Sequence, residues 1–200
     1  MTKYFATLIL VCTVIIASAQ VKAQVGLKGG LNLASINTDD PAASYEATTG
    51  YHLGAYALIK VLSFGIQPEV LYSVKGAAGE RIDISGVKSD FSQDLVYLEF
   101  PIMAKFYLPL GLNVQAGPQF GTLISAEGKI ENSGGTTTIS KDSYKNSDIS
   151  AAIGAGWDMP FGLNVSARYV IGLSDVNDGN GEEAKNRTFQ LSVGFKLFGI

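Results

Sequence analysis

The sequence predicts an all-β protein, an eight-stranded antiparallel up-and-down transmembrane β-barrel with short periplasmic turns and long extracellular loops. Three observations predict it. Apolar and polar residues alternate over eight stretches, glycines share the polar side of that alternation, and the connections alternate between short and long. A soluble half-buried strand has no reason to make its polar side small. Small and polar residues together fit the narrow interior of a barrel whose apolar side faces lipid.

Each alternating stretch has at least the 9–11 residues that a tilted membrane strand needs. The predicted strands cover residues 24–34, 49–60, 63–76, 94–107, 112–125, 148–159, 163–174 and 187–198. Short turns are expected at residues 61–62, 108–111 and 160–162, and long polar loops at 35–48, 77–93, 126–147 and 175–186. An even number of strands places both ends of the barrel domain on the periplasmic side.

The glycines indicate that the polar side of the strands faces the barrel interior, because ten of them fall on that side. They are Gly26, Gly30, Gly54, Gly65, Gly117, Gly121, Gly154, Gly156, Gly172 and Gly194. Aromatic residues on the apolar side gather near the two ends of the strands, as in the aromatic girdles of membrane barrels. Those near the short turns are Phe64, Phe106, Trp157, Phe161, Phe195 and Phe198; those near the long loops are Tyr51, Tyr72, Phe120, Tyr169 and Phe189.

The first 23 residues are predicted to be a secretory signal peptide, and residues 24–200 to be the outer-membrane barrel domain. A short positive start precedes an apolar run, and small-residue cleavage patterns precede both Gln20 and Gln24; we favour Gln24. Cys12 leaves with the signal, so no disulfide framework is expected. No later run of eighteen apolar residues could form a membrane helix, so export points to the bacterial outer membrane.

Three prolines fall inside predicted strands, where a closed barrel has no edge to accommodate them. They are Pro68, Pro101 and Pro118. Each is expected to mark a β-bulge.

Several segments resemble the PorT-type outer-membrane β-barrel proteins of the Bacteroidota. The resemblance extends over essentially the whole chain after the signal. It is carried by residues 25–32 (VGLKGGLN), 66–76 (IQPEVLYSVKG), 97–105 (YLEFPIMAK), 115–121 (QAGPQFG), 167–169 (ARY) and 172–173 (GL). The resemblance implies an OmpA/OmpX-like eight-stranded barrel. It implies no single activity, although the founding member is linked to a protein secretion system.

Charged residues on the polar side of the strands form the candidate site. They are Lys28, Glu69, Lys75, Glu99, Lys105 and Arg168, with Gln67, Gln115 and Gln119 around them, and Asp158 shares that side. Charges in a narrow lumen need partners, because burial desolvates them. We therefore expect an internal salt-bridge network that fills the barrel; the alternative is a proton or ion path.

Little else in the sequence suggests chemistry. His52 is the only histidine, no motif places a serine beside it, and it is expected to be a solvated histidine at the membrane interface. The loop at residues 175–183 has the residue types of a calcium site but not the EF-hand spacing, so a solvated turn is expected. No cofactor or metal is predicted, and the acidic loops argue against nucleic acid.

The leading functional hypothesis is a non-enzymatic, monomeric outer-membrane barrel whose four long loops make surface interactions or help maintain the envelope. Three alternatives stay open at this point. The first is an accessory component of an envelope secretion system. The second is a membrane-embedded lipid-modifying enzyme, which would depend on His52. The third is a soluble periplasmic barrel that binds an apolar ligand, which would need the apolar side of the strands inward.

Overall fold

The computed structural model describes residues 21–38, 43–82, 88–132, 135–139, 147–173 and 184–200, with side chains at residues 21–34, 48–75, 95–126, 147–173 and 187–200. Residues 1–20 of the predicted signal peptide lie outside the described residues, and so does the loop at 175–183. The strands are β1 Val21–Thr38, β2 Ala43–Val61, β3 Phe64–Ile82, β4 Lys88–Tyr107, β5 Leu112–Asn132, β6 Gly135–Ile139, β7 Ser147–Asp158, β8 Leu163–Gly172 and β9 Ala184–Gly199. No helix within the described ranges is long and apolar enough to cross a membrane.

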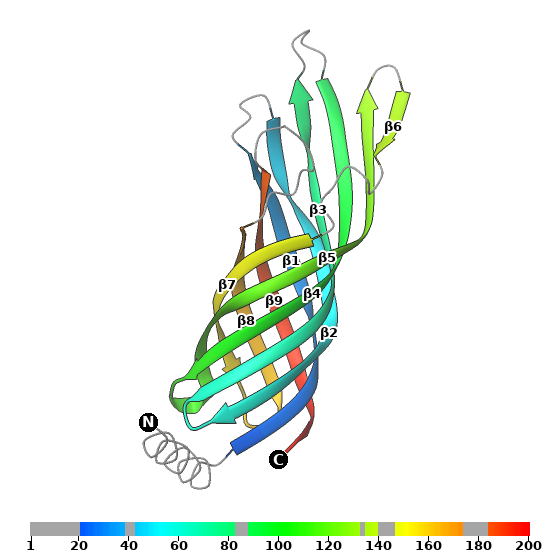
Figure 1. Ribbon diagram of the computed structural model, residues 1–200. Coiled ribbons are helices and arrows are strands. Elements are labelled where there is room, and N and C mark those ends of the chain that lie inside the picture. Colours follow the sequence, from blue (N-terminus) through cyan, green and yellow to red (C-terminus); the bar gives the residue numbers. More distant parts are fainter. Residues whose placement is uncertain (1–20, 39–42, 83–87, 133–134, 140–146, 174–183) are drawn as a thin grey trace, which may run out of the picture.

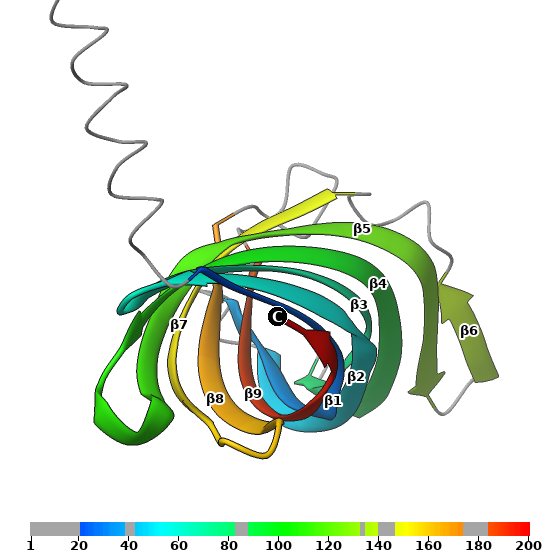
Figure 2. The same ribbon diagram turned by 90° about the horizontal axis from the view of Figure 1, so that it is seen from below.

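Eight of these strands close into an antiparallel up-and-down barrel, which confirms the predicted fold class. Neighbours in sequence pair with one another, β5 pairs with β7, and β1 pairs with β9 to complete the ring. Figure 2 shows this ring from below, with β9 beside β1 and the short β6 outside it. The tilted strands form a tall cylinder, and the C-terminus lies at the same end as the short turns (Figure 1).

Two of the three short turns lie where the sequence predicts them, and the first lies one residue later, at residues 62–63. The two that match depend on glycine. A 3₁₀ turn at Pro109–Gly111 precedes β5, and Gly111 has a φ of +83°. Gly162 occupies the corresponding place before β8, with a φ of +94°. Only glycine adopts such a backbone without steric cost, which explains why both turns combine proline with a following glycine. Trp157 secures the first turn by donating from Nε1 to the Leu110 carbonyl (3.0 Å).

The apolar side of the strands faces outward and the polar side faces the lumen. Leu53 is 62% exposed and Ile153 is 61% exposed, although both are aliphatic residues in the middle of strands. All six charged residues of the candidate site are instead buried in the lumen, where they lie among amide, tyrosine and some aliphatic side chains. A soluble barrel with an apolar interior would need the opposite orientation, so that alternative is wrong.

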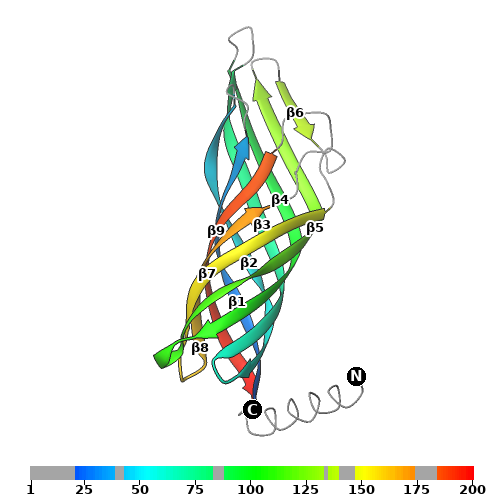
Figure 3. The ribbon, with the colours of Figure 1, turned by 60° about the vertical axis from the view of Figure 1, so that its left-hand side comes forward.

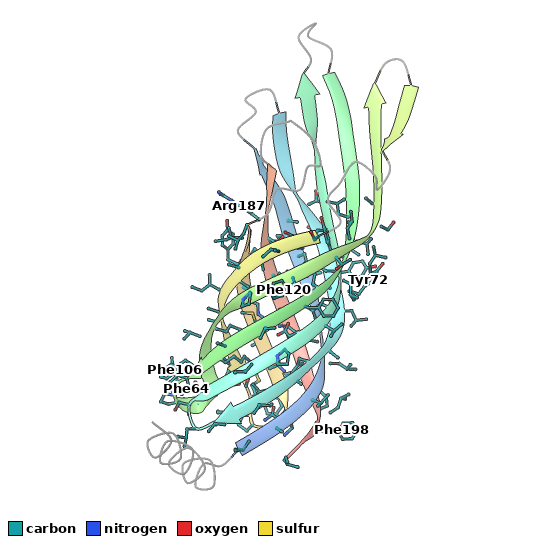
Figure 4. The ribbon with its side chains drawn as sticks, viewed as in Figure 1. Phe64, Tyr72, Phe106, Phe120, Arg187 and Phe198 are labelled. Atoms are coloured by element: carbon teal, nitrogen blue, oxygen red, sulfur yellow. The ribbon has the colours of Figure 1, made fainter. Side chains whose placement is uncertain are left out.

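Aromatic side chains form outward-facing groups toward both ends of the barrel. In Figure 4, Phe64 and Phe106 lie beside the turns, with their ring centroids 5.2 Å apart, and Phe198 lies at the same end. Tyr72 and Phe120 lie on the outer surface further toward the loop end (Figure 4). From Phe64 to Tyr72, eight residues of tilted strand rise roughly 20 Å, which approaches the height of an outer-membrane apolar band.

The three strand prolines do not mark bulges, so that prediction is wrong. Pairing registers are the same on both sides of Pro68, Pro101 and Pro118. Each proline instead coincides with a short interruption of the ladder to the preceding strand, while its pairing with the following strand continues. A proline has no N–H to donate, so one ladder loses a bridge without a change of register. The register shifts lie elsewhere, one of them between Val96 and Tyr97.

The strands continue well into the stretches predicted as loops. Pairing of β1 with β2 ends at Ala34 and Thr48, but β2, β3, β4 and β5 continue beyond it. There β6 pairs with β5 from residue 128 to residue 132 and takes the place that β7 holds within the barrel. We call this sheet, residues 43–47, 76–82, 88–94, 127–132 and 135–139, the extension; it rises beyond the rest of the barrel in Figures 1 and 3.

Candidate functional site

Glu69 lies at the centre of the polar lumen and is held by two cations. Its carboxylate accepts from both terminal nitrogens of Arg168, with Nη1 2.8 Å from Oε2. Lys28 Nζ lies 3.2 Å from Oε1, and Gln67 donates to the same oxygen at 2.6 Å. Arg168 also donates from Nε to Gln115 Oε1 (3.1 Å). The paired fork geometry and the amide contacts satisfy charges that burial would otherwise make costly.

Asp158 organises a second group nearer the turns. Lys105 Nζ lies 3.1 Å from its Oδ2 and donates to Gln67 Oε1 at 2.9 Å, which links this group to the Glu69 group. The Tyr107 hydroxyl donates to the same carboxylate at 2.6 Å. Asp158 is therefore an internal counterion for Lys105.

A third group lies toward the loop end of the lumen. Lys75 forms an ion pair with Glu99, and its Nζ lies 3.8 Å from Asp148 Oδ2. The same ammonium lies 5.1 Å from the centre of the Tyr97 ring, within cation–π range. The Ser150 hydroxyl donates to Asp148 Oδ1 (3.3 Å). All of these side chains are buried.

His52 lies in the lumen and is only 2% exposed, so its prediction as a solvated interface residue is wrong. Its Nδ1 lies 2.8 Å from Asn32 Oδ1, and its Nε2 lies 2.9 Å from Ser192 Oγ. Asn32 Nδ2 donates to Ser73 Oγ (2.9 Å), so Oδ1 is the atom left to accept from the imidazole. Nδ1 then carries the proton, and Nε2 accepts from the Ser192 hydroxyl.

The hydrogen bonds that join Asn32, His52 and Ser192 cross three strands, β1, β2 and β9. They can do so because β1, the middle strand, carries a glycine. Gly30 of β1 pairs with His52 on one side and with Ser192 on the other. A Cβ on Gly30 would clash with the backbone carbonyl of Leu191 and lie 2.8 Å from His52 Cε1. A Cβ on Gly26 would clash with the backbone carbonyl of Phe195 and lie 2.6 Å from the Tyr56 ring. Lumenal glycines therefore make room for large side chains from neighbouring strands.

The structure places all six predicted charged residues in the lumen, but in three groups around Glu69, Glu99 and Asp158. Glu69 collects Lys28 and Arg168, Glu99 pairs with Lys75, and Lys105 turns to Asp158. Asp158 shares the polar side in the sequence but was not included in the predicted network. The Asn32–His52–Ser192 chain was also missed, because its members are 20 and 140 residues apart and only barrel closure joins them.

The lumen ends in a cavity at the turn end. Its volume is about 310 Å³, and Tyr56, Tyr107, Leu58 and Asp158 are among the residues that line it. Its lysines are Lys22, Lys60 and Lys196. The two tyrosines and Leu58 form a buried cluster, and Lys60 Nζ lies 3.6 Å from the centre of the Tyr107 ring. The lumen is thus filled in its middle and open to a small polar cavity at one end.

Comparison with solved structures shows the same fold at low sequence identity. The attachment invasion locus protein Ail of Yersinia pestis has a TM-score of 0.52 at 14% identity, over 88% of this chain and 99% of Ail. Neisserial surface protein A, NspA, has a TM-score of 0.52 at 11% identity, over the same shares of the two chains. No curated protein matches the sequence.

A family match agrees with the geometry. Residues 18–178 match the family described as outer membrane protein beta-barrel domain, which covers most of the chain. The outward apolar surface, the outward aromatics at both ends and the filled polar lumen are what that environment requires. The chain therefore belongs to the outer membrane protein beta-barrel domain family.

Proposed function

We propose that this protein is a non-enzymatic outer-membrane barrel whose extension binds a cationic partner at the cell surface. The single observation that carries the proposal is the register of acidic residues across the extension. Glu80 pairs with Asp90, and Asp90 pairs with Glu131, so three acids occupy one row over adjacent strands. Like charges directly opposite one another destabilise a sheet unless something neutralises them.

The same face carries more acid than this row. Alternation along the strands places six acids and two lysines on it by register: Glu46, Glu80, Asp90, Asp94, Glu127 and Glu131, with Lys88 and Lys129. The extension also ends in β6, which pairs with β5 and with no other strand of the described residues. An unpaired edge can accept an extended segment of another chain through backbone hydrogen bonds.

The filled lumen supports a role at the surface rather than transport. Eight strands enclose space for side chains and no open channel. The ion pairs of Glu69, Glu99 and Asp158 occupy that space. We propose that this network is a structural plug that holds the barrel rigid beneath the extension.

The first test compares two triple variants of equal charge change. Glu80→Gln, Asp90→Asn and Glu131→Gln together remove the acidic row, whereas Asp175→Asn, Asp178→Asn and Glu182→Gln remove three acids from another loop. The barrel in lipid nanodiscs is titrated with poly-L-lysine at two ionic strengths. We expect the row variant to lose most of the affinity and its salt dependence. Equal losses in the two variants would contradict a site on the extension.

The second candidate is a lipid-modifying hydrolase. It is favoured because Ser192 (nucleophile), His52 (base) and Asn32 (orienting group) are joined in that order by hydrogen bonds. Burial argues against it: Ser192 is 4% exposed, and a substrate carbonyl must approach the hydroxyl to about 3 Å. We expect a fluorophosphonate serine probe to leave the folded barrel unlabelled. Labelling at Ser192 that His52→Ala abolishes would establish the enzyme.

The finer resemblance to PorT-type proteins of the Bacteroidota suggests a third candidate, an accessory part of an envelope secretion system. Cross-linking in intact cells tests it, since such a part would be recovered with large envelope proteins. Recovery that survives the loss of the acidic row would place the contact elsewhere on the barrel.

A further inference from the structure

The lysines of the turn-end cavity differ from those deeper in the lumen. Lys28, Lys75 and Lys105 each have a carboxylate partner within the barrel. Within the part of the chain that the structure describes, no carboxylate forms an ion pair with any of the three cavity lysines, Lys22, Lys60 and Lys196. The barrel therefore pairs its deeper lumenal lysines with carboxylates and leaves those at the turn end without an ion pair among the described residues.

These three lysines line one partly open cavity; Lys22 is exposed, and Lys60 and Lys196 are half-buried. Lys60 and Lys196 lie on the lumenal side of β2 and β9, and Lys22 lies on that side of β1. Asp158 at the floor attracts Lys60 without forming an ion pair with it, because the Asp158 carboxylate is bound by Lys105 and the Tyr107 hydroxyl. The cavity thus has a positive rim above a polar and aromatic floor.

We propose that the turn-end cavity binds the oxyanion of a small phosphate-bearing ligand. The ammonium groups of Lys60 and Lys196, which remain in the chain after either predicted cleavage, line about 310 Å³ and can bind a phosphate between them. Asn164 also lines the cavity, and its Nδ2 holds the Tyr56 hydroxyl there by donating to it at 2.9 Å. The site lies at the opposite end of the barrel from the extension and does not depend on the function proposed for it.

The test titrates the full-length barrel in phosphate-free maltoside detergent with inorganic phosphate. Binding is followed through the backbone amide signals of Gly162 and Gly199, which line the cavity. We expect saturable shifts, and an affinity at least about tenfold weaker in the double variant Lys60→Gln, Lys196→Gln. These two lysines remain in the chain wherever export cleavage falls, at Gln20 or at Gln24.

Arg187→Gln is the matched control, since Arg187 is exposed on the outer surface toward the loop end (Figure 4). It should leave the phosphate affinity unchanged. A heat-dependent shift on unboiled gels verifies that each variant is folded. Absence of saturable shifts in the wild type, or an equal affinity in the folded double variant, would overturn the proposal.

A second arm identifies the source of the phosphate. The titration is repeated in nanodiscs of phosphatidylglycerol, whose headgroups carry phosphate at the membrane surface. Unchanged affinity for added phosphate would assign the site to a soluble ligand. Weaker apparent affinity in these discs than in phosphate-free detergent brought to the same negative surface charge with a carboxylate amphiphile would assign it to a lipid headgroup.

Discussion

The two faces of the barrel sheet are made by the same strands but obey opposite rules. On the outer face, aliphatic residues such as Ile153 are exposed and no partner is needed. On the lumenal face, Glu69 is buried and is held by Lys28 and Arg168. The outer face is specified by composition alone, whereas the lumenal face is specified by individual pairings. On the outer face, any apolar residue should therefore be tolerated in place of another. On the lumenal face, a substitution should be tolerated only if it keeps the interaction with its specific partner.

The largest effect is expected from Glu69→Ala, which leaves two buried cations without their carboxylate. Removing one partner of a buried pair costs about 3–5 kcal/mol. The free energy of unfolding, from urea titration of the folded barrel in detergent, measures it.

An apolar replacement of the whole group separates charge from packing. In the triple variant K28M, E69L and R168M no charge is left unpaired, and we expect most of the stability to return. Equal stability of Glu69→Ala and the wild type would show that the Glu69 group contributes nothing.

The outer face is tested by Ile153→Lys, near the middle of β7. A lysine at the centre of the lipid-facing band should lower the free energy of unfolding by about 2–4 kcal/mol. Ser147→Lys, at the first residue of β7, is the matched control and should cost roughly 0–1 kcal/mol. Similar losses at the two positions in lipid vesicles would argue against a membrane centred on residue 153.

A neighbouring pair of glycines compares the two faces directly. A Cβ on Gly30 would clash with the backbone carbonyl of Leu191 and lie 2.8 Å from His52 Cε1, whereas a Cβ on Gly29 would meet the flexible end of Leu53 at 3.3 Å. We expect Gly30→Ala to cost about 1–3 kcal/mol through overpacking, and Gly29→Ala to cost less. Thermal unfolding followed by gel mobility ranks the two variants; the reverse order would contradict the crowded lumen.

The smallest effect is expected from Lys60→Gln at the turn-end cavity. Lys60 has no carboxylate partner among the described residues, so its loss should change the unfolding free energy by less than about 0.5 kcal/mol. Lys28→Gln provides the contrast, because it removes one of the two cations that hold Glu69. A large loss in Lys60→Gln would show that its contact with the Tyr107 ring is structurally important.

The sequence predicts the barrel well because alternation is a local property. Residues two apart share a face, so the positions of Glu69, Arg168 and the lumenal glycines follow from their neighbours in the chain. The glycines also show which side faces inward, since only a crowded interior explains why the residues on the polar side are small.

Partner choice does not follow from the sequence, because it depends on register and strand tilt. Glu69 and Arg168 lie 99 residues apart, and alternation alone cannot say that they meet. The same applies to His52 and Ser192, which come together only across Gly30. The prediction for the prolines is wrong for another reason. A missing N–H was expected to produce a bulge and shift the strand register, but a long antiparallel pairing keeps its register across a short interruption.

The pairing of β1 with β9 makes closure of the barrel a late step in folding. Leu31 and Leu191 are partners, so the ring cannot close until nearly the whole chain has been synthesised and exported. Until then both terminal strands present open edges, which invite association with other chains. Closure over so long a loop is intrinsically slow. Truncation of the final strand should therefore leave the edge of β1 unpaired and prevent closure of the barrel.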